Sequence, residues 1–257
     1  MRLMKRILSA AAVLALSASL LVGCSSTASS VPASASSAAE STVSSVEETA
    51  SSAVDENEAA AAQLLNDLTG SYQELWPVIL ADEYKQTWLD DCTALVGEEN
   101  AEAAFEKLSS MVTSDVYGED AVEAYANGGG AYFCGFTNSL ATLTFDGETS
   151  TISGTDKDGN VLFSHAYHYI GMEPVRGLYE FQSDDADSGE FTYFFLAPDT
   201  SAETYHIEFR YGSDAEALSQ YDAGEYAYWL ASGISTDCDQ TMIDNCIELF
   251  CTENLAG

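Results

Sequence analysis

Between residues 131 and 211 the chain alternates apolar and polar residues in short segments, and this alternation constrains the fold most strongly. A period of two is typical of β-strands, whose successive side chains point to opposite faces. The expected strands are 131–137, 140–145, 150–154, 160–169, 177–181, 191–197 and 205–211. Turn-forming pairs such as Asp146-Gly147 and Asp158-Gly159 separate them. Because no helix fits between strands so closely spaced, the pattern predicts an antiparallel sheet or barrel.

Helical patterns flank these strands on both sides. Before them, apolar residues at helical spacing predict helices over 58–66, 100–110 and 119–126. After them, Thr236-x-x-Asp239 resembles a capping box, and apolar residues from Met242 to Phe250 recur at helical spacing. The chain is therefore predicted to be mainly β, with helices toward its N- and C-terminal ends.

The first 24 residues have the composition of an export signal. Three basic residues stand within the first six, and residues 7–22 are small or apolar and carry no charge. That run is short for a membrane span, which needs about 20 apolar residues, and it fits the hydrophobic region of a signal peptide. It closes on Leu21-Val22-Gly23-Cys24, which resembles a lipobox and makes Cys24 the predicted lipidation site. The alternative is an ordinary secretory signal with a coincidental cysteine.

Residues 25–57 are rich in Ser and Ala and hold almost no side chain large enough to bury. Such a segment does not recover its ordering entropy, which predicts a disordered tether. Residues 58–257 are long enough for one domain with a core of its own. We therefore expect a signal peptide over 1–24, a tether over 25–57 and a domain over 58–257. The protein would sit in the cell envelope, outside the cytoplasm, anchored to the membrane by a lipid on Cys24.

The chain is strongly acidic, with 42 Asp and Glu residues against 8 Lys and Arg and a formal net charge of −34. This charge excludes nucleic acid as a partner, because binding it requires basic residues that replace counterions. An anionic bilayer would repel the domain as well, which leaves the lipid on Cys24 as the anchor. The negative field attracts cations only diffusely, and solubility explains most of these carboxylates.

Five cysteines remain besides Cys24, and their number is odd. They are Cys92, Cys134, Cys238, Cys246 and Cys251. Disulfides are permitted outside the cytoplasm, so at most two can form and one thiol stays free, with the pairing undefined by the sequence. No CxxC spacing is present, which argues against a zinc–thiolate knuckle.

Candidate metal ligands stand on the last of the expected strands. In His206-Ile207-Glu208-Phe209-Arg210-Tyr211, strict alternation places His206, Glu208 and Arg210 on one face and the apolar residues on the other. Imidazole nitrogen and carboxylate oxygen are both zinc ligands, so the His-x-Glu pair can supply two of them. The alternative is a polar, solvent-facing side closed by a contact of Glu208 with Arg210 or His206.

The other histidines, His165 and His168, are three residues apart in an expected strand and therefore lie on opposite faces. We expect each to have a structural role, because the two are unable to reach one ion. The sequence contains no GxSxG or HExxH motif and no carboxylate pair that stands out as a glycosidase dyad. We therefore predict that the protein is not an enzyme.

Taken together, several segments resemble the ZinT/YodA family of zinc- and cadmium-binding proteins, from about residue 65 to residue 250. Residues 68–77 look like the family's opening L-x-D-W-x-G-x-W-Q-S-V-Y-P, and 175–181 like its G-V-R-Y-L-F strand. Leu196-Ala197-Pro198 matches I-A-P, and 206–214 matches H-F-H-I-x-x-G-N-D. The resemblance implies a lipocalin-like (calycin) barrel that binds a divalent metal.

In that family the ligands are histidines, one located three residues before the Ala-Pro pair and two in the H-x-H. Carried across, His206 takes the first place of the pair and Glu208 the second, whereas Phe194 stands in place of the upstream histidine. The resemblance implies zinc, with cadmium as a further candidate, held for capture or for delivery to a metal ABC importer.

Two alternatives remain open. One is a metal-free module that binds a small organic ligand in a Tyr- and Phe-lined barrel cavity, or binds a partner. The other is an enzyme that uses His206 and Glu208 as acid and base.

Overall fold

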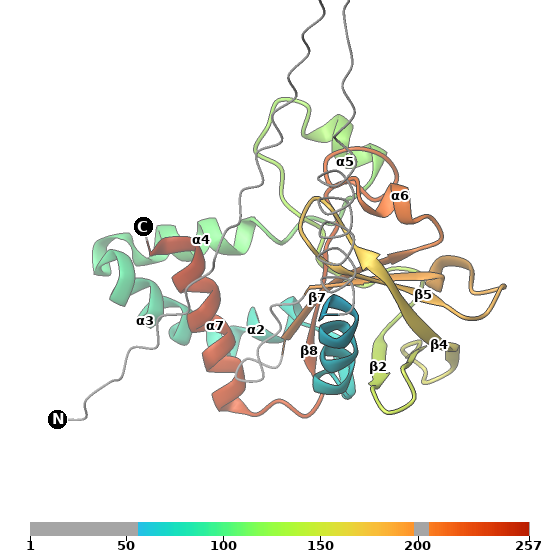
Figure 1. The fold of residues 1–257 in the computed structure, drawn as a ribbon. Helices are drawn as coiled ribbons and strands as arrows, with labels where there is room; N and C mark the ends of the chain where they lie inside the picture. The colour runs from blue at the N-terminus through green and yellow to red at the C-terminus, as the bar shows by residue number, and fades with distance from the viewer. Residues whose placement is uncertain (1–55, 198–205, 257) are drawn as a thin grey trace, which may run out of the picture. The chain divides into compact units, whose positions relative to one another are not determined.

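Eight antiparallel strands close into a barrel, in which each strand pairs with its neighbours in chain order and the last pairs with the first (Figure 1). This computed structural model describes residues 56–197 and 206–256. The strands are β1 (Gly70–Glu74), β2 (Thr142–Asp146), β3 (Thr151–Thr155), β4 (Val161–Met172), β5 (Tyr179–Ser183), β6 (Tyr193–Leu196), β7 (His206–Gly212) and β8 (Ala231–Ser235). The predicted antiparallel barrel is confirmed, and its closure removes exposed sheet edges.

Six of the expected strands correspond to β2 through β7, whereas the first one is wrong. Residues 131–137 form only single bridges, from Phe133 to Thr113 and to Trp229. The backbone of this segment runs along the chain that leads into β8, where Leu230 N–H donates to the Phe133 carbonyl at 3.1 Å and Ser232 N–H to the Cys134 carbonyl at 3.0 Å. The segment is thus extended and hydrogen-bonded, but it lies outside the barrel.

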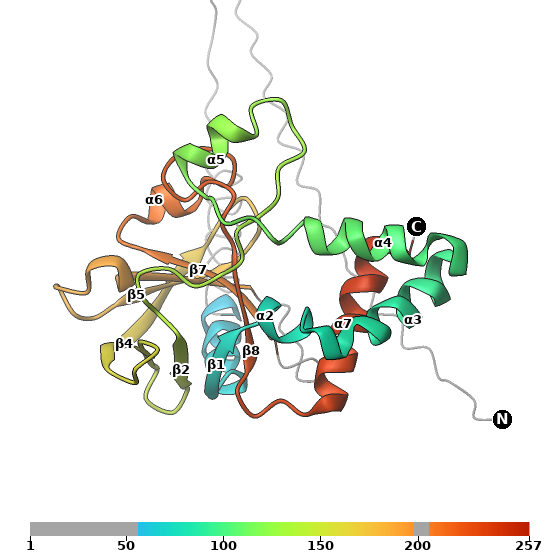
Figure 2. The same cartoon turned by 180° about the vertical axis from the view of Figure 1, so that it is seen from behind.

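The two strands that close the barrel, β1 and β8, were not predicted. They pair with each other in antiparallel register, with Gln73 opposite Ile234 (Figure 2). Strand β8 reads Ala-Ser-Gly-Ile-Ser and is buried at four of its five positions. Small residues on both faces leave little contrast between apolar and polar positions, so the alternation that marks the other strands is absent here.

The barrel interior is filled by aromatic and aliphatic side chains. Phe145, Phe181, Phe194, Phe209 and Tyr211 are each at most 1% exposed. A helix over residues 56–67 packs its apolar face, including Leu64 and Leu65, against the same cluster. The interior is therefore a packed core, and the aromatic residues expected to line an open barrel cavity are the side chains that fill it.

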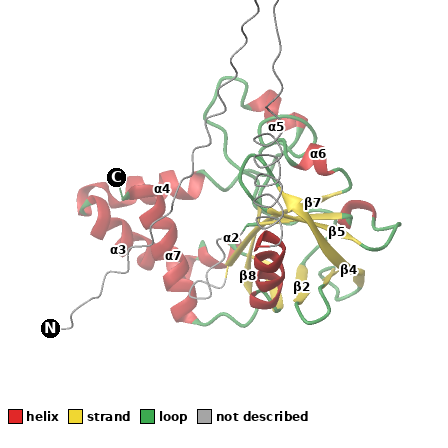
Figure 3. Ribbon diagram, viewed as in Figure 1, coloured by secondary structure: helices red, strands yellow, loops and turns green. Residues whose placement is uncertain are grey.

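The remaining helices are α2 (Trp76–Ile79), α3 (Lys85–Val96), α4 (Glu98–Ser110), α5 (Glu119–Ala124), α6 (Ala215–Leu218) and α7 (Gln240–Leu255). Helices α3, α4 and α7 contact one another, and α2 contacts α7 (Figure 3). Their shared core includes Trp88, which is fully buried, and extends to Ile234 on the outside of β8. The helical layer therefore packs on the outer surface of the barrel wall. No helix in the described part of the chain is long and apolar enough to cross a membrane.

The predicted C-terminal helix is confirmed, but its cap lies at a different residue. The Asp239 carboxylate accepts from the Met242 backbone N–H at 3.0 Å and so caps α7. Thr236 instead donates its backbone N–H and its hydroxyl to the Ser71 carbonyl on β1. Thr236 therefore extends the pairing of β8 with β1 and does not begin the helix.

Candidate functional site

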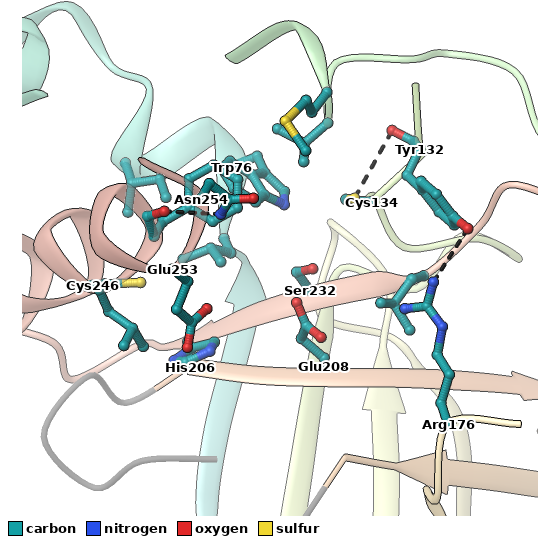
Figure 4. A pocket seen from close by; sticks show the side chains of 17 residues that line it. Trp76, Tyr132, Cys134, Arg176, His206, Glu208, Ser232, Cys246, Glu253 and Asn254 are labelled. Carbon is teal, nitrogen blue, oxygen red and sulfur yellow. Dashed lines mark hydrogen bonds between the residues drawn. The ribbon is translucent and has the colours of Figure 1, made fainter. Parts of the chain in front are cut away.

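A cavity of about 290 Å³ lies between the outer surface of the barrel wall and helices α2 and α7. The barrel contributes His206 and Glu208 from β7 and Ser232 from β8. Helix α7 contributes Cys246 and Glu253, and the β4–β5 connection contributes Arg176. Figure 4 shows these side chains around one space, with Arg176 on one side, His206 and Glu253 on the other, and Glu208 and Ser232 between them.

Strand β7 separates its side chains as the alternation predicts. Ile207, Phe209 and Tyr211 belong to the barrel core and are at most 1% exposed. His206 and Glu208 are partly buried and face the cavity on the opposite side of the wall. The structure thus brings the two predicted ligands together, from neighbouring outward positions of one strand. Tyr205, the first residue of the expected strand, lies outside the described residues.

Phe194, which stands in place of a family histidine, is on the other side of the wall. It pairs with Tyr211 across β6 and β7, and paired residues share a face. Its ring stacks on Tyr211 with 5.3 Å between centroids and is fully buried. A side chain at position 194 therefore points into the barrel core and not toward His206 and Glu208.

Carboxylates give the cavity a negative potential that reaches its two thiols. Burial raises the pKa of Cys134 to about 12, and the charge of Glu208 adds to the rise. Burial likewise raises the pKa of Cys246 to about 12, with further contributions from Cys238, Glu208 and Glu253. Both thiols are therefore protonated at neutral pH. Figure 4 shows the Glu253 carboxylate pointing toward the His206 imidazole.

Arg176 supplies the cation of the cavity and is held by its surroundings. Its guanidinium donates to the Tyr132 hydroxyl at 3.2 Å and lies 4.4 Å from the centroid of the Tyr221 ring. Its backbone N–H donates to the buried Glu173 carboxylate at 2.6 Å. The guanidinium, a planar group of N–H donors, is therefore held against an aromatic surface where Arg176 lines the cavity and is exposed to solvent.

Arg210 shares the outer face of β7 but does not line the cavity. It is fully buried, and its guanidinium donates to the backbone carbonyls of Leu218, Gln220 and Tyr226. Burial lowers its pKa, and contact with Tyr221 opposes that shift. The Arg210 guanidinium therefore clamps the 218–226 segment against the outer face of β7.

The other histidines and the cysteines have separate positions. His165 and His168 each place Nδ1 2.6 Å from a different carboxylate, that of Asp185 and that of Asp184, in agreement with their predicted separation. All five described cysteines are free thiols, and the sulfur atoms of Cys92 and Cys251 lie 3.9 Å apart between α3 and α7. Cys24 lies outside the described residues, so its lipidation stays a prediction.

Within residues 56–197 and 206–256, no three His, Cys, Asp or Glu side chains are grouped as the ligands of a metal ion. The sequence did not identify Glu253, Arg176 or Trp76 as residues of the site. Arg176 carried one usable signal, because it is among only five Lys or Arg residues that follow the first 24 positions of a very acidic chain. Glu253 carried none, since acidic residues are frequent throughout.

The fold and site define a closed eight-stranded antiparallel barrel with a charged cavity on its outer surface. No family model and no curated protein sequence matches the chain. Among solved structures, the chain is similar to the Zn(II)-bound ZinT-like domain of Streptococcus pneumoniae AdcA, with 14% identity and a TM-score of 0.45, over 72% of this chain and 89% of that domain. It is also similar to Zn(II)-bound AdcA from Streptococcus pneumoniae, with 14% identity and a TM-score of 0.42, over 72% of this chain and 35% of that protein.

Proposed function

We propose that this domain binds a divalent metal ion, with zinc as the first candidate and cadmium as a second, at His206 and Glu208. Its role would be to capture the ion or to deliver it to an importer. The observation that carries the proposal is that β7 directs both side chains into one cavity on the outer surface of the barrel. The Zn(II) in the two AdcA structures is a property of those proteins.

The donor types in the cavity suit zinc. One imidazole, two carboxylates and two thiols line it, and each is a known zinc ligand. His206 and Glu208 would hold the ion from the barrel side, and Glu253 would approach from α7. The strongly negative chain also favours the arrival of a cation through its long-range field.

Titration calorimetry of zinc into the purified protein tests this proposal. We expect one site with micromolar or tighter affinity in the unaltered chain. The same site should disappear in the double variant His206→Ala, Glu208→Ala, because two ligands are lost together. The matched control is His168→Ala, Glu148→Ala, which removes one imidazole and one carboxylate from exposed positions on other strands and turns.

Weak binding at many sites, equal in all three proteins, would contradict the proposal. It would mean that zinc is attracted only by the acidic surface. Loss of the tight site in the control variant alone would place it near His168 instead.

We also propose that the protein is exported and anchored in the cell envelope through a lipid on Cys24. The basic start, the apolar run and the lipobox support this placement. Mass spectrometry of the N-terminal peptide would detect a diacylglyceryl group on Cys24 as the new first residue. Recovery of an unprocessed chain beginning at Met1, with an unmodified Cys24, would contradict it.

A second candidate function is binding of a small organic molecule in the same cavity. Trp76, Leu230 and Phe250 give it apolar walls beside the charged groups. A mixture of apolar walls and a few converging polar groups is typical of small-molecule sites. An organic ligand would therefore bind on the outer surface of the barrel and not in its filled interior.

A further inference from the structure

The cavity is much larger than a single metal ion needs. Its volume is about 290 Å³, whereas one water molecule takes up about 30 Å³ of liquid. A metal held by His206 and Glu208 would occupy only one end of this space. The rest has room for an organic molecule of roughly the size of an amino acid.

The far end of the cavity carries hydrogen-bond donors suited to an anion. Arg176 is fixed there against the rings of Tyr132 and Tyr221, at 5.5 and 4.4 Å from their centroids. A guanidinium pairs with a carboxylate through two parallel N–H donors. The positive charge of Arg176 repels a bare metal ion in the same cavity, but it attracts the carboxylate of a metal complex.

A second donor, the indole N–H of Trp76, also lies at the cavity. Trp76 is 8% exposed; its buried indole nitrogen meets no oxygen acceptor among the described residues, and it lies near the Cys134 thiol, whose pKa it lowers. A thiol is a weak acceptor, so a carboxylate oxygen of a ligand would give this N–H a stronger partner. Trp76 reaches the cavity from α2, independently of Arg176.

We propose that the metal enters this cavity as a complex with a small α-amino carboxylate. The amine and one carboxylate oxygen would chelate the ion held by His206 and Glu208. The remaining carboxylate oxygen would accept hydrogen bonds from Arg176 and Trp76, while Phe250 and Leu230 would contact the organic part. This inference rests on the proposed metal-binding function and specifies the form of its substrate.

Equilibrium dialysis of the full chain against radiolabelled L-histidine, with and without equimolar zinc, tests the inference. We expect about one histidine retained per chain when zinc is present, and at least tenfold weaker retention when it is absent. Unlabelled histidine should displace the label at a much lower concentration than histamine does, because histamine chelates zinc but lacks the carboxylate. This competition needs only the unaltered protein, so it is independent of how variants fold.

The variant Arg176→Gln gives a second readout. Its zinc-dependent retention of histidine should fall about tenfold or more, since a hydrogen bond between two charged groups is among the strongest in proteins. Zinc alone should bind more tightly than to the unaltered chain, because a positive charge has left the cavity. A purely structural effect would weaken both. Lys157→Gln, which removes an exposed cation from the turn between β3 and β4, is the matched control.

The outcomes separate this inference from the function on which it rests. Tight zinc binding without histidine retention would contradict binding of the metal as an amino-acid complex. Removal of zinc from the protein by histidine would contradict it as well. Both outcomes leave the proposed metal binding intact. Histidine retained equally without zinc would overturn it too, in favour of an organic ligand alone. Absence of both kinds of binding would overturn the metal-binding function itself.

Discussion

The two faces of strand β7 differ in almost every property, although their residues alternate along seven positions of one chain. The inner face places Ile207, Phe209 and Tyr211 in a core with at most 1% exposure. The outer face carries an imidazole, a carboxylate and a guanidinium, and it is covered by the helical layer and the 218–226 segment. The inner face stabilises the barrel, and the outer face presents groups that can bind a ligand.

The unsatisfied polar atoms follow the same division. The buried side-chain nitrogen and oxygen atoms without a partner in the described residues are Trp76 Nε1, Asp91 Oδ2 and Arg210 Nε, all outside the barrel core. Unpaired buried groups are uncommon, and their absence from the described residues of the barrel core agrees with its dense packing. Small barrels of this class can enclose a ligand, but here the interior is filled. The binding function is therefore expected on the outer surface of the wall.

The largest expected effect is on the inner face. Phe209→Ala should lower the free energy of unfolding by about 3–5 kcal/mol, because it removes a fully buried ring that contacts Phe136 and Phe194. Glu208→Ala, one position away on the outer face, should lower it less, because this side chain is only partly buried and does not belong to the barrel core. Urea unfolding of the two variants measures the contrast directly. Equal losses would contradict the division between the faces.

The second largest effect on stability is expected at Arg210, which lies on the outer face of β7 and is fully buried. Arg210→Lys keeps the charge but loses the planar fork that contacts three carbonyls of the 218–226 segment. We expect a loss of about 2–3 kcal/mol in urea unfolding, since buried carbonyls lose their donors. Unchanged stability would mean that an ammonium group satisfies the same carbonyls.

A smaller effect depends on pH and concerns the thiols of the outer surface. The pKa of Cys246 is raised to about 12 in the folded chain, from 9.0 for an unperturbed thiol. The unfolded chain therefore releases this proton first, so the stabilising contribution is complete below pH 9 and is lost as the pH rises toward 12. Between pH 9 and pH 10, Cys246→Ala should lose about 1 kcal/mol less than the unaltered chain. Parallel pH profiles would contradict this.

The sequence predicted the barrel because alternation survives wherever a strand has one polar face, as in β7. It did not predict β8, where small residues occupy both faces, or the position of residues 131–137, whose partners are not strands of the barrel. The strand periodicity placed His206 and Glu208 on one face correctly. Arg176, Glu253 and Trp76 were not predicted, because they reach the cavity from other elements and only tertiary packing brings them to β7.

The smallest expected effect lies in the helical layer, at Asp91 on α3. Burial raises the pKa of this carboxyl, and the charges of Glu248, Asp244 and Asp90 raise it further. A raised pKa favours the folded chain only at acidic pH, and that contribution is lost as the pH rises through the folded-state pKa. Asp91→Asn should therefore stabilise the protein at pH 7, by about 0.5–1 kcal/mol after allowance for solvent screening.

The advantage of Asp91→Asn should shrink as the pH falls, because the raised pKa lets the carboxyl of the unaltered chain take up a proton. The exposed neighbour Asp90→Asn is the control, because its side chain bonds Gln86 at the surface of the same helix. Thermal unfolding of both variants at pH 7 and pH 4 measures the difference. A gain in stability at Asp91 that is independent of pH would indicate better packing of the asparagine. It would contradict the interpretation that the helical layer holds an unfavourable buried charge.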